Sequence, residues 1–333
     1  MRKLPIVGPD PYTPEWYALR RYDPDRVERP VVFGASEASI ALGVNPYCSV
    51  LELYLRKRCE IADIEDNTAM MVGRALEPVV LDLYAKREGV EIKKQPSLYL
   101  HPEYSFMAAT PDAIRLGDQR SWERPVDAKA TTFRRYDRQG ASQNHYGIDG
   151  SDQLPIDLMC QAQQQMEVLC LEMADFPVLF DVQTLRVYSI RYEGDLVVAI
   201  AKAEKELAER IVNADPPEPN WCLEGTSKLI SGMFGYTPGK SVALSAEAVA
   251  NWRQYKELGK QVEELEKQKT HLKNRILYEM QDCELADLGD GKELRRLSVP
   301  TSRITMEDVE DIAKRVGDVK REGYEKVLER KKR

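Results

Sequence analysis

The sequence is poor in the residues that build soft-metal sites. It has six cysteines, no two of them in a CxxC spacing, and three histidines among 333 residues, so a zinc site is not expected. No run of about 18 apolar residues could span a membrane. The first residues, broken by Pro5 and Pro9, contain no apolar signal-peptide core. We therefore expect a cytoplasmic protein with core thiols and no membrane anchor.

An excess of positive charge is also missing. Asp and Glu number 55 against 48 Lys and Arg, which gives a formal net charge of −7. A local basic stripe nevertheless suffices for nucleic-acid binding, and an acidic balance suits a site that gathers divalent cations. The apolar fraction of 43% and the charged fraction of 31% are typical of a globular protein.

The pattern of the first 213 residues alternates between helical and strand periods. A short helix near residues 14–20 precedes a helical stretch over 34–60 with a break at Asn45-Pro46. A longer helix begins at residue 67 or 68 and ends at Gly89, and Pro78 within it predicts a kink or a late start. Further on, the predicted strands are 97–100, 106–110, 113–116, 126–130, 178–183 and 186–192, with helices over 154–172 and up to about 212. This order predicts an α/β core.

The rest of the chain has a different composition. Residues 214–244, rich in Pro and Gly, predict a linker between a domain at 1–213 and an extension at 245–333. A helix is expected from Ser245 to Gln281, followed by a β-hairpin around 289–291, a helix capped by Thr305 and a basic tail. The helix carries a coiled-coil seam of about three heptads, which could pair with another chain or fold back on its own domain. Its residues are Tyr255, Leu258, Val262, Leu265, Leu272 and Ile276.

The stretch most informative about chemistry joins Thr110-Pro-Asp112 to Val126-Asp-Ala-Lys129. On a strand, residues i and i+2 point to the same face, so Asp127 and Lys129 are expected to project together. A hairpin between this strand and the strand that follows Asp112 would bring two carboxylates and one ammonium group to one end of the sheet. A D-x-K pair alone is more often an ordinary ion pair than a catalytic one.

Such a cluster suits hydrolysis of a phosphodiester. Carboxylate-bound Mg²⁺ keeps several waters and can make one of them nucleophilic near neutral pH. A lysine can orient or deprotonate that water and offset phosphate charge. Glu77, on the preceding predicted helix, would add a third carboxylate, and Gly73 one turn earlier leaves room for a phosphate.

Four strings resemble one family in their order and spacing. They are Gly73-Arg-Ala-Leu-Glu77, Thr110-Pro-Asp-Ala113, Val126-Asp-Ala-Lys129 and Met159-Cys-Gln-Ala-Gln-Gln-Gln-Met166. Together they resemble the YqaJ-type viral recombinases, relatives of phage lambda exonuclease in the PD-(D/E)XK nuclease superfamily. The resemblance covers about residues 14–212. It implies a restriction-endonuclease-like core, in which helices flank a central mixed sheet. The coiled-coil helix and hairpin predicted above form a C-terminal extension to this core.

The resemblance also implies an activity and partners. The expected reaction is Mg²⁺-dependent 5′-to-3′ degradation of one strand of duplex DNA, with Mn²⁺ as a substitute metal. The 3′ single strand left behind would pass to a single-strand-annealing protein in phage-type recombination. A phage or prophage gene expressed in a bacterial host is a further implication. Another is a ring-shaped homo-oligomer, which in relatives is commonly a trimer.

Carried onto this sequence, Glu77, Asp112 and Asp127 are similar to the metal-binding acids of the family and Lys129 to its catalytic lysine. Gln161 is similar to the family's helix glutamine beside the active site. The following glutamines, residues 163–165, are expected to form a polar helix face. Asp127 stands where relatives usually carry Glu, and Ala113 occupies a common Gly position.

A second motif, Trp16-Tyr-Ala-Leu-Arg20, is similar to the family's W-x-x-x-R. By the same resemblance Arg20 and Ser36 would bind the terminal 5′-phosphate, although Ser36 could equally act only as a helix cap. An apparent insertion over residues 21–30 leaves Arg29 as an alternative ligand to Arg20.

Two other functions remain open. A non-specific endonuclease or defence nuclease could use the same core. A non-catalytic DNA-end-binding scaffold could rely on the coiled coil, but a scaffold would not need three acids beside a lysine.

Overall fold

The computed structural model describes residues 4–11, 13–26, 30–62, 67–94, 97–131, 146–235, 237–289 and 293–295. The chain divides into two compact units, Met1–Pro238 and Gly239–Arg333. The division falls within the predicted linker, which also contains a helix that the sequence did not predict, α8 (Thr226–Phe234). Within these described ranges, no helix is long and apolar enough to cross a membrane.

A six-stranded mixed sheet forms the centre of the first unit. Its order is β10-β9-β7-β6-β3, and β8 also pairs with β9. The strands are β3 (Glu91–Lys94), β6 (Ala113–Leu116), β7 (Trp122–Val126), β8 (Lys129–Thr131), β9 (Met173–Phe180) and β10 (Thr184–Arg191). β7 and β8 run parallel to β9, and the other pairs are antiparallel. The expected mixed sheet is confirmed, although β3 was not predicted.

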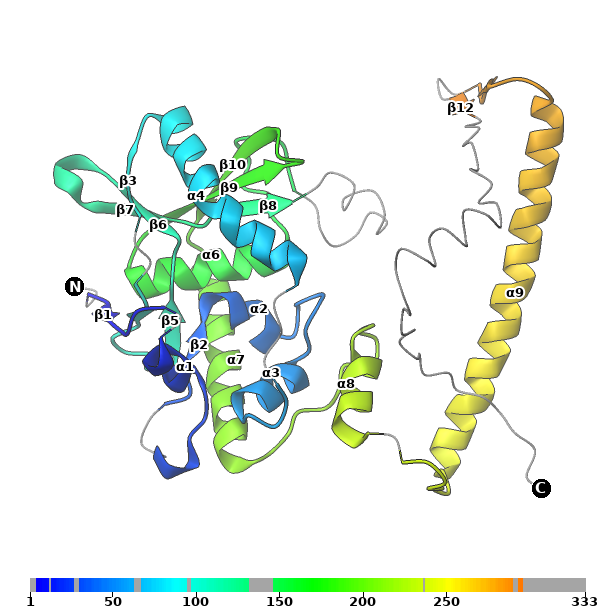
Figure 1. Ribbon diagram of the computed structural model, residues 1–333, viewed down its shortest axis with the longest axis horizontal. Coiled ribbons are helices and arrows are strands. Elements are labelled where there is room, and N and C mark those ends of the chain that lie inside the picture. The colour runs from blue at the N-terminus through cyan, green and yellow to red at the C-terminus, as the bar shows by residue number, and fades with distance from the viewer. Residues whose placement is uncertain are drawn as a thin grey trace, which may run out of the picture. The chain divides into compact units, whose positions relative to one another are not determined.

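Two helices, α4 (Thr68–Glu88) and α6 (Ile156–Leu169), cover opposite faces of this sheet (Figure 1). Alternate side chains of β9 explain the two layers. Phe176 packs in one cluster with Met166 of α6, whereas the neighbouring Asp175 accepts a 2.5 Å hydrogen bond from the hydroxyl of Tyr84 on α4. Because both faces are covered, β9 is buried along nearly its whole length.

The bounds of α4 follow from its caps. The side chain of Asn67 accepts a hydrogen bond from the N–H of Met70, and Gly89 ends the helix in the left-handed conformation at φ 64°. The predicted ends are confirmed. Pro78 lies inside the helix, so the alternative of a late start is wrong. The proline nitrogen carries no hydrogen, so residue 78 donates no backbone hydrogen bond within the helix.

The N-terminal part forms a smaller layer beside α6. Its four-stranded sheet has the order β1-β4-β5-β2. The elements of this layer are β1 (Ile6–Val7), α1 (Pro14–Arg20), η1 (Pro24–Arg26), β2 (Phe33–Gly34), η2 (Ala35–Glu37), α2 (Ala38–Ala41), α3 (Val50–Lys57), β4 (Tyr99–Leu100) and β5 (Met107–Ala109). The helix α7 (Gly194–Asn213) packs against it, and η3 (Asp118–Arg120) connects β6 to β7 in the central sheet. Gln164 of α6 donates to the carbonyls of Phe33 and Ala108, both at 3.1 Å. These bonds fix the start of η2 against α6.

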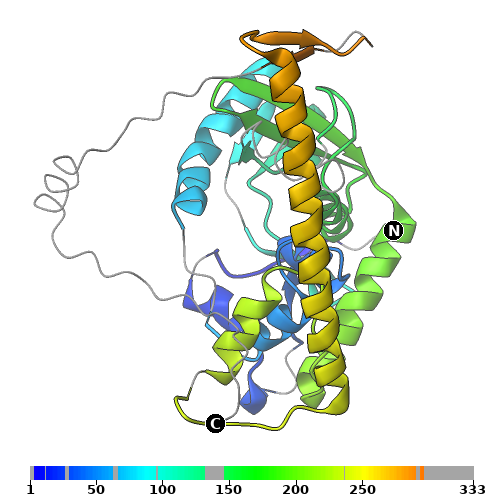
Figure 2. The same cartoon turned by 90° about the vertical axis from the view of Figure 1, so that its right-hand side faces the viewer.

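The second unit is built on one long helix, α9 (Ala246–Met280), followed by a hairpin of β11 (Leu285–Asp287) and β12 (Glu293–Arg295). Figure 2 shows α9 as a single uninterrupted helix. Its N-terminus is capped by Ser245, whose hydroxyl accepts from the N–H of Ala248. The predicted long helix and hairpin are confirmed, whereas the helix capped by Thr305 and the basic tail lie outside the described residues.

Candidate active site

The sequence over 126–130 does not form one continuous strand. β7 ends at Val126 and β8 begins at Lys129, yet both pair with β9 in the same register. The prediction of an unbroken strand is therefore wrong, and the hydrogen bonds give the reason. The N–H of Asp127 still donates to a carbonyl of β9 (3.1 Å), but the N–H of Ala128 donates to the carboxylate of Asp112 (2.8 Å). The interruption brings Asp112 to the end of β7.

Asp127 lies at the centre of the resulting cluster and is only 2% exposed. One carboxylate oxygen forms an ion pair with the ammonium group of Lys129, as the i, i+2 spacing predicts. The other oxygen accepts from the side-chain amides of Gln161 (2.8 Å) and Gln165 (2.7 Å). Both carboxylate oxygens of Asp127 are thus held in fixed directions.

The neighbouring acids are electrostatically crowded. Burial raises the pKa of Asp112 well above its usual range, and the charges of Asp127 and Glu77 raise it further. The pKa of Glu77 is raised by burial and then by Asp127. Burial alone would lower the pKa of Lys129, but Asp127 and Asp112 raise it above its ordinary value. The lysine therefore stays protonated beside three acids.

The glutamines of α6 do not form the polar helix face that the sequence suggested. Gln163, Gln164 and Gln165 are fully buried, so that expectation is wrong. Each finds a different partner: Gln163 donates to the carbonyl of Arg191 at 2.8 Å, Gln164 holds the N-terminal layer, and Gln165 joins Gln161 on Asp127. The i, i+4 spacing of Gln161 and Gln165 puts both on one face of α6, and this spacing was the available signal for Gln165.

One pocket of about 360 Å³ joins the acids to the predicted phosphate ligands. Its lining residues are Pro11, Trp16, Arg20, Gly34, Ala35, Ser36, Arg74, Glu77, Thr110, Asp112, Gln161 and Gln165. Arg20 and Ser36 therefore share a cavity with Glu77 and Asp112, although they lie on other elements. Arg29 lies outside the described residues. Arg74 was missed in the sequence, although its i, i+3 spacing from Glu77 places it on the same helix face.

Arg20 is held in place from two sides. Its guanidinium lies 4.4 Å from the centroid of the Trp16 ring and 3.0 Å from a carboxylate oxygen of Glu37. Glu37 also accepts from Lys57 and from the N–H of Gly34, both at 2.8 Å. Burial by itself would raise the pKa of Glu37, but Arg20 and Lys57 lower it to about 2. A permanent negative charge thus orients Arg20 at the pocket.

The donor set of the pocket fits a hard divalent cation. Carboxylate oxygens are the ligands that Mg²⁺ and Mn²⁺ prefer. The side-chain oxygen of Gln165 is buried and accepts no hydrogen bond, so it could receive one from a metal-bound water. Among the described residues, no three His, Cys, Asp or Glu side chains lie close enough to hold an ion as they stand. Binding would require Asp127 to exchange its contact with Lys129 for the metal.

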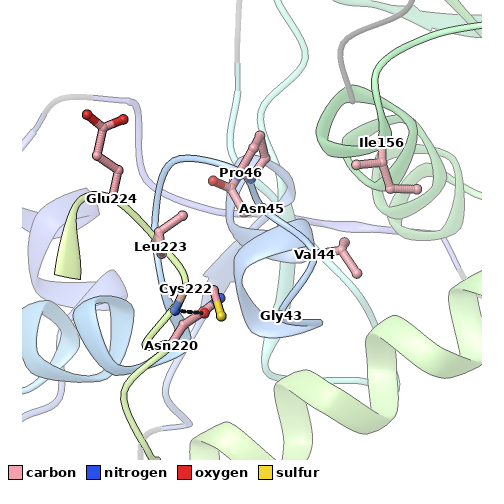
Figure 3. A pocket seen from close by; sticks show the side chains of 9 residues that line it. All are labelled: Gly43, Val44, Asn45, Pro46, Ile156, Asn220, Cys222, Leu223 and Glu224. Carbon is pink, nitrogen blue, oxygen red and sulfur yellow. Dashed lines mark hydrogen bonds between the residues drawn. The ribbon is translucent and has the colours of Figure 1, made fainter. Parts of the chain in front are cut away.

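A larger pocket of about 580 Å³ lies elsewhere, between residues 43–46 and 220–224 with Ile156 at its edge (Figure 3). Its described lining includes one carboxylate, Glu224, and no cationic side chain. The side chain of Asn220 turns back to accept from the N–H of Cys222 (3.1 Å). This lining offers no means of binding a phosphate beside a metal, so the smaller pocket is the candidate active site.

Comparison with known proteins agrees with the motif order. The family model described as the YqaJ-like viral recombinase domain matches residues 15–172. Residues 15–172, just under half of the chain, are therefore similar to this family, and we call them the YqaJ-like domain. Apart from Pro11, the matched residues contain the whole lining of the candidate site, from Trp16 to Gln165, whereas α7 and the second unit lie beyond them.

Similarity to known proteins extends past residues 15–172. The chain is 26% identical over 274 residues to the uncharacterized protein YqaJ of Bacillus subtilis (strain 168), covering 79% of this chain and 80% of that protein. Among solved structures, an alkaline exonuclease (LHK-Exo) from Laribacter hongkongensis has a TM-score of 0.43 at 19% identity, covering 61% of this chain and 94% of that one. A phage-related exonuclease from Haemophilus somnus 129PT has a TM-score of 0.39 at 13% identity, covering 56% and 96%.

Proposed function

We propose that the YqaJ-like domain is a metal-dependent DNA exonuclease that hydrolyses one strand of a linear duplex from its 5′ end. The observation that carries this proposal is the single pocket shared by Glu77 and Asp112 with Arg20 and Ser36. An endonuclease needs only the acids and the lysine. A cation and a hydroxyl on separate elements, in the same cavity, suit a strand that ends there.

The proposed hydrolysis requires a divalent cation in addition to the side chains of the protein. Glu77, Asp112 and Asp127 would hold Mg²⁺ or Mn²⁺, which when bound supplies a nucleophilic water and neutralises phosphate charge. Lys129, whose pKa in the metal-free protein is raised by Asp127 and Asp112, would orient or deprotonate the attacking water and offset the charge of the phosphate. Gln161 and Gln165 keep Asp127 aligned.

The other end of the pocket recognises the terminal phosphate. A guanidinium makes strong, often bidentate hydrogen bonds to phosphate. Arg20 is already oriented by Glu37 and Trp16, which reduces the entropy lost on binding. The exposed Ser36 lies in the short turn η2 and offers a hydroxyl to the same anion. Arg74, one turn before Glu77, adds a second cation to this pocket.

The product and assembly follow from the same proposal. Removal of nucleotides from the 5′ end leaves a 3′ single strand, the substrate of a single-strand-annealing protein in phage-type recombination. A ring-shaped homo-oligomer around the duplex would keep the enzyme on one DNA molecule.

The test compares two forms of one plasmid in Mg²⁺. Linearised duplex should be converted to mononucleotides and single strands, while the covalently closed circle stays intact. Equal cutting of the circle would leave an endonuclease on the same core. Binding to linear ends without hydrolysis, in Mg²⁺ and in Mn²⁺, would leave the end-binding scaffold.

A further inference from the structure

The helix α9 has an apolar stripe that its own unit does not bury. The stripe has 3–4 spacing, and each member is between 45% and 68% exposed. Its members are Tyr255, Leu258, Val262, Leu265, Leu272 and Ile276. A 35-residue helix whose stability rests on such a stripe requires a partner surface along it.

The identity of the residues in this stripe specifies the partner. In a heptad labelled abcdefg, Val262 and Ile276 occupy a positions, and Leu258, Leu265 and Leu272 occupy d positions. β-branched residues at a with leucine at d favour a parallel, two-stranded coiled coil. The a position between Val262 and Ile276 holds Lys269. A single polar residue at a is a device that fixes register and strand number.

The charges of α9 are compatible with a second copy of the same helix. Three of the four g positions along the seam are glutamines (Gln254, Gln261, Gln268). The fourth is Arg275, which parallel pairing places opposite Met280, so no like charges meet across these flanks. Lys269 enters the seam with a counter-charge from its own helix, because its ammonium lies 3.5 Å from a carboxylate oxygen of Glu266. Outside the seam, charged residues pair within the helix, as Lys267 does with Glu263 at 2.9 Å.

We propose that α9 pairs with α9 of a second copy of this chain as a parallel, in-register, two-stranded coiled coil. The pairing joins two copies of the second unit and does not depend on the nuclease activity proposed for the first. Contacts between nuclease domains, if they form a ring, would be separate from this one.

The first experiment measures the mass of the full chain by light scattering. Leu265→Asp with Leu272→Asp places two charges in the seam at d positions and should halve the mass of the wild-type assembly. The matched control is Lys267→Asp with Asn274→Asp, which has the same seven-residue separation on the outer face and should keep the wild-type mass. Thermal melting of both variants verifies that each remains folded.

Three outcomes overturn the proposal. A monomeric wild-type chain means that the stripe folds back on its own chain. An unchanged mass in the seam variant means that other contacts make the oligomer. A fall to one third means three strands.

The second experiment tests orientation through Cys283, which is exposed and lies just past the end of α9. A parallel in-register pair brings the two copies of Cys283 together, whereas an antiparallel pair separates them by about 50 Å, the length of the helix. Mild oxidation should therefore give a disulfide-linked dimer that Cys283→Ser abolishes. Absence of this Cys283-dependent dimer would overturn the parallel arrangement.

Discussion

Three carboxylates and one ammonium group meet where β7 gives way to β8. Asp127 is fully engaged with Lys129 and the α6 glutamines, whereas Asp112 uses one oxygen for the N–H of Ala128. Burial, and then the negative charge of Asp127, raises the pKa of Asp112 and of Glu77. The ionised forms of Asp112 and Glu77 are therefore less favourable in the metal-free protein than they would be beside a bound cation.

The first prediction concerns catalysis. Lys129→Ala should lower the rate of nucleotide release roughly 10²–10⁴-fold, the range for a group that assists proton transfer or charge stabilisation. Asp112→Ala and Asp127→Ala should each abolish release. Rates per folded molecule on linear duplex in excess Mg²⁺ measure these losses, with Lys94→Ala as an exposed-lysine control on β3. Full activity in any one of the three would remove that residue from the mechanism.

The second prediction concerns stability against pH. The raised pKa of Asp112 means that the folded protein binds its proton more tightly than the unfolded chain, so stability falls as the pH rises above the unfolded value of about 3.9. Asp112→Asn keeps a side-chain oxygen that can accept from the N–H of Ala128, and it removes the free-energy cost of ionising the buried carboxyl. In EDTA at pH 7 the variant should melt at a higher temperature than the wild type, and near pH 3 the difference should vanish.

Added Mg²⁺ supplies the control for this second prediction. Binding to the native state raises the melting temperature, so Mg²⁺ should stabilise the wild type more than Asp112→Asn. Equal melting temperatures in EDTA at pH 7 would show that the carboxylates do not repel each other in the free protein.

The third prediction concerns the end of the strand. If Arg20 binds the terminal phosphate, 5′-phosphorylated duplex should be degraded faster than 5′-hydroxyl duplex. Arg20→Ala should erase a preference of roughly ten- to a hundredfold, equivalent to about 1.5–3 kcal/mol for hydrogen bonds to a charged group. Arg21→Ala is the matched control, since its guanidinium lies over the ring of Tyr17. A preference that survives in Arg20→Ala but not in Arg29→Ala would transfer the role to Arg29.

The contacts of a single residue could be predicted only where they depend on its spacing from residues nearby in the sequence. Asp127 and Lys129 share a face because i and i+2 do so even across the interruption. Glu37 could not be predicted, because its role depends on Arg20, Lys57 and Gly34 meeting through the tertiary fold. Gln165 was missed because a run of glutamines is polar in any helical projection. Its i, i+4 spacing from Gln161 was the one signal that it shares the partner of Gln161.

At the scale of elements, α6 connects the two halves of the pocket. Gln161 and Gln165 bind Asp127, while Gln164 binds the carbonyls of Phe33 and Ala108 beside η2. One helix thus sets the position of the acids relative to the proposed phosphate ligands.

The fourth prediction tests whether Gln165 on α6 positions Asp127 for catalysis or only contributes to the stability of the fold. Gln165→Leu should lower kcat roughly ten- to a hundredfold, because Asp127 loses a charged hydrogen bond of about 1.5–3 kcal/mol, with a smaller change in KM. Gln163→Leu removes an amide of the same helix that bonds a backbone carbonyl instead, and should destabilise the fold without changing kcat per folded molecule. Indistinguishable kcat values for the two variants would limit Gln165 to a structural role.

Elements with strong local signals were predictable, and elements defined by their neighbours were not. The caps of α4 and the turn residues around β6 gave nearly correct bounds. β3 carries Lys93 and Lys94 and reads as polar, because it is an edge strand. The division of residues 126–130 into β7 and β8 depends on a hydrogen bond from Ala128 to Asp112, which no periodicity reveals.

At the scale of the whole molecule, one unit holds the candidate active site and the other presents a helix suited to pairing. The division at Pro238 falls within the predicted linker. α8 was not predicted there, because the Gly and Pro residues around it indicate a loop. Its Leu229 packs against a core cluster of the first unit that includes Leu51 and Leu207, a tertiary contact that no local pattern reveals.

The central claim is that the YqaJ-like domain degrades DNA from the 5′ end with Asp112, Asp127 and Lys129. The most direct test follows matched linear duplexes labelled at either the 5′ or the 3′ end, incubated with wild type or Lys129→Ala. In Mg²⁺ or Mn²⁺ the wild type should release the 5′ label at once as mononucleotide, while the 3′ label stays in long strands. Ca²⁺ and EDTA should each prevent release, and Lys129→Ala should slow it roughly 10²–10⁴-fold. Release in EDTA, or equal release by Lys129→Ala, would contradict the account.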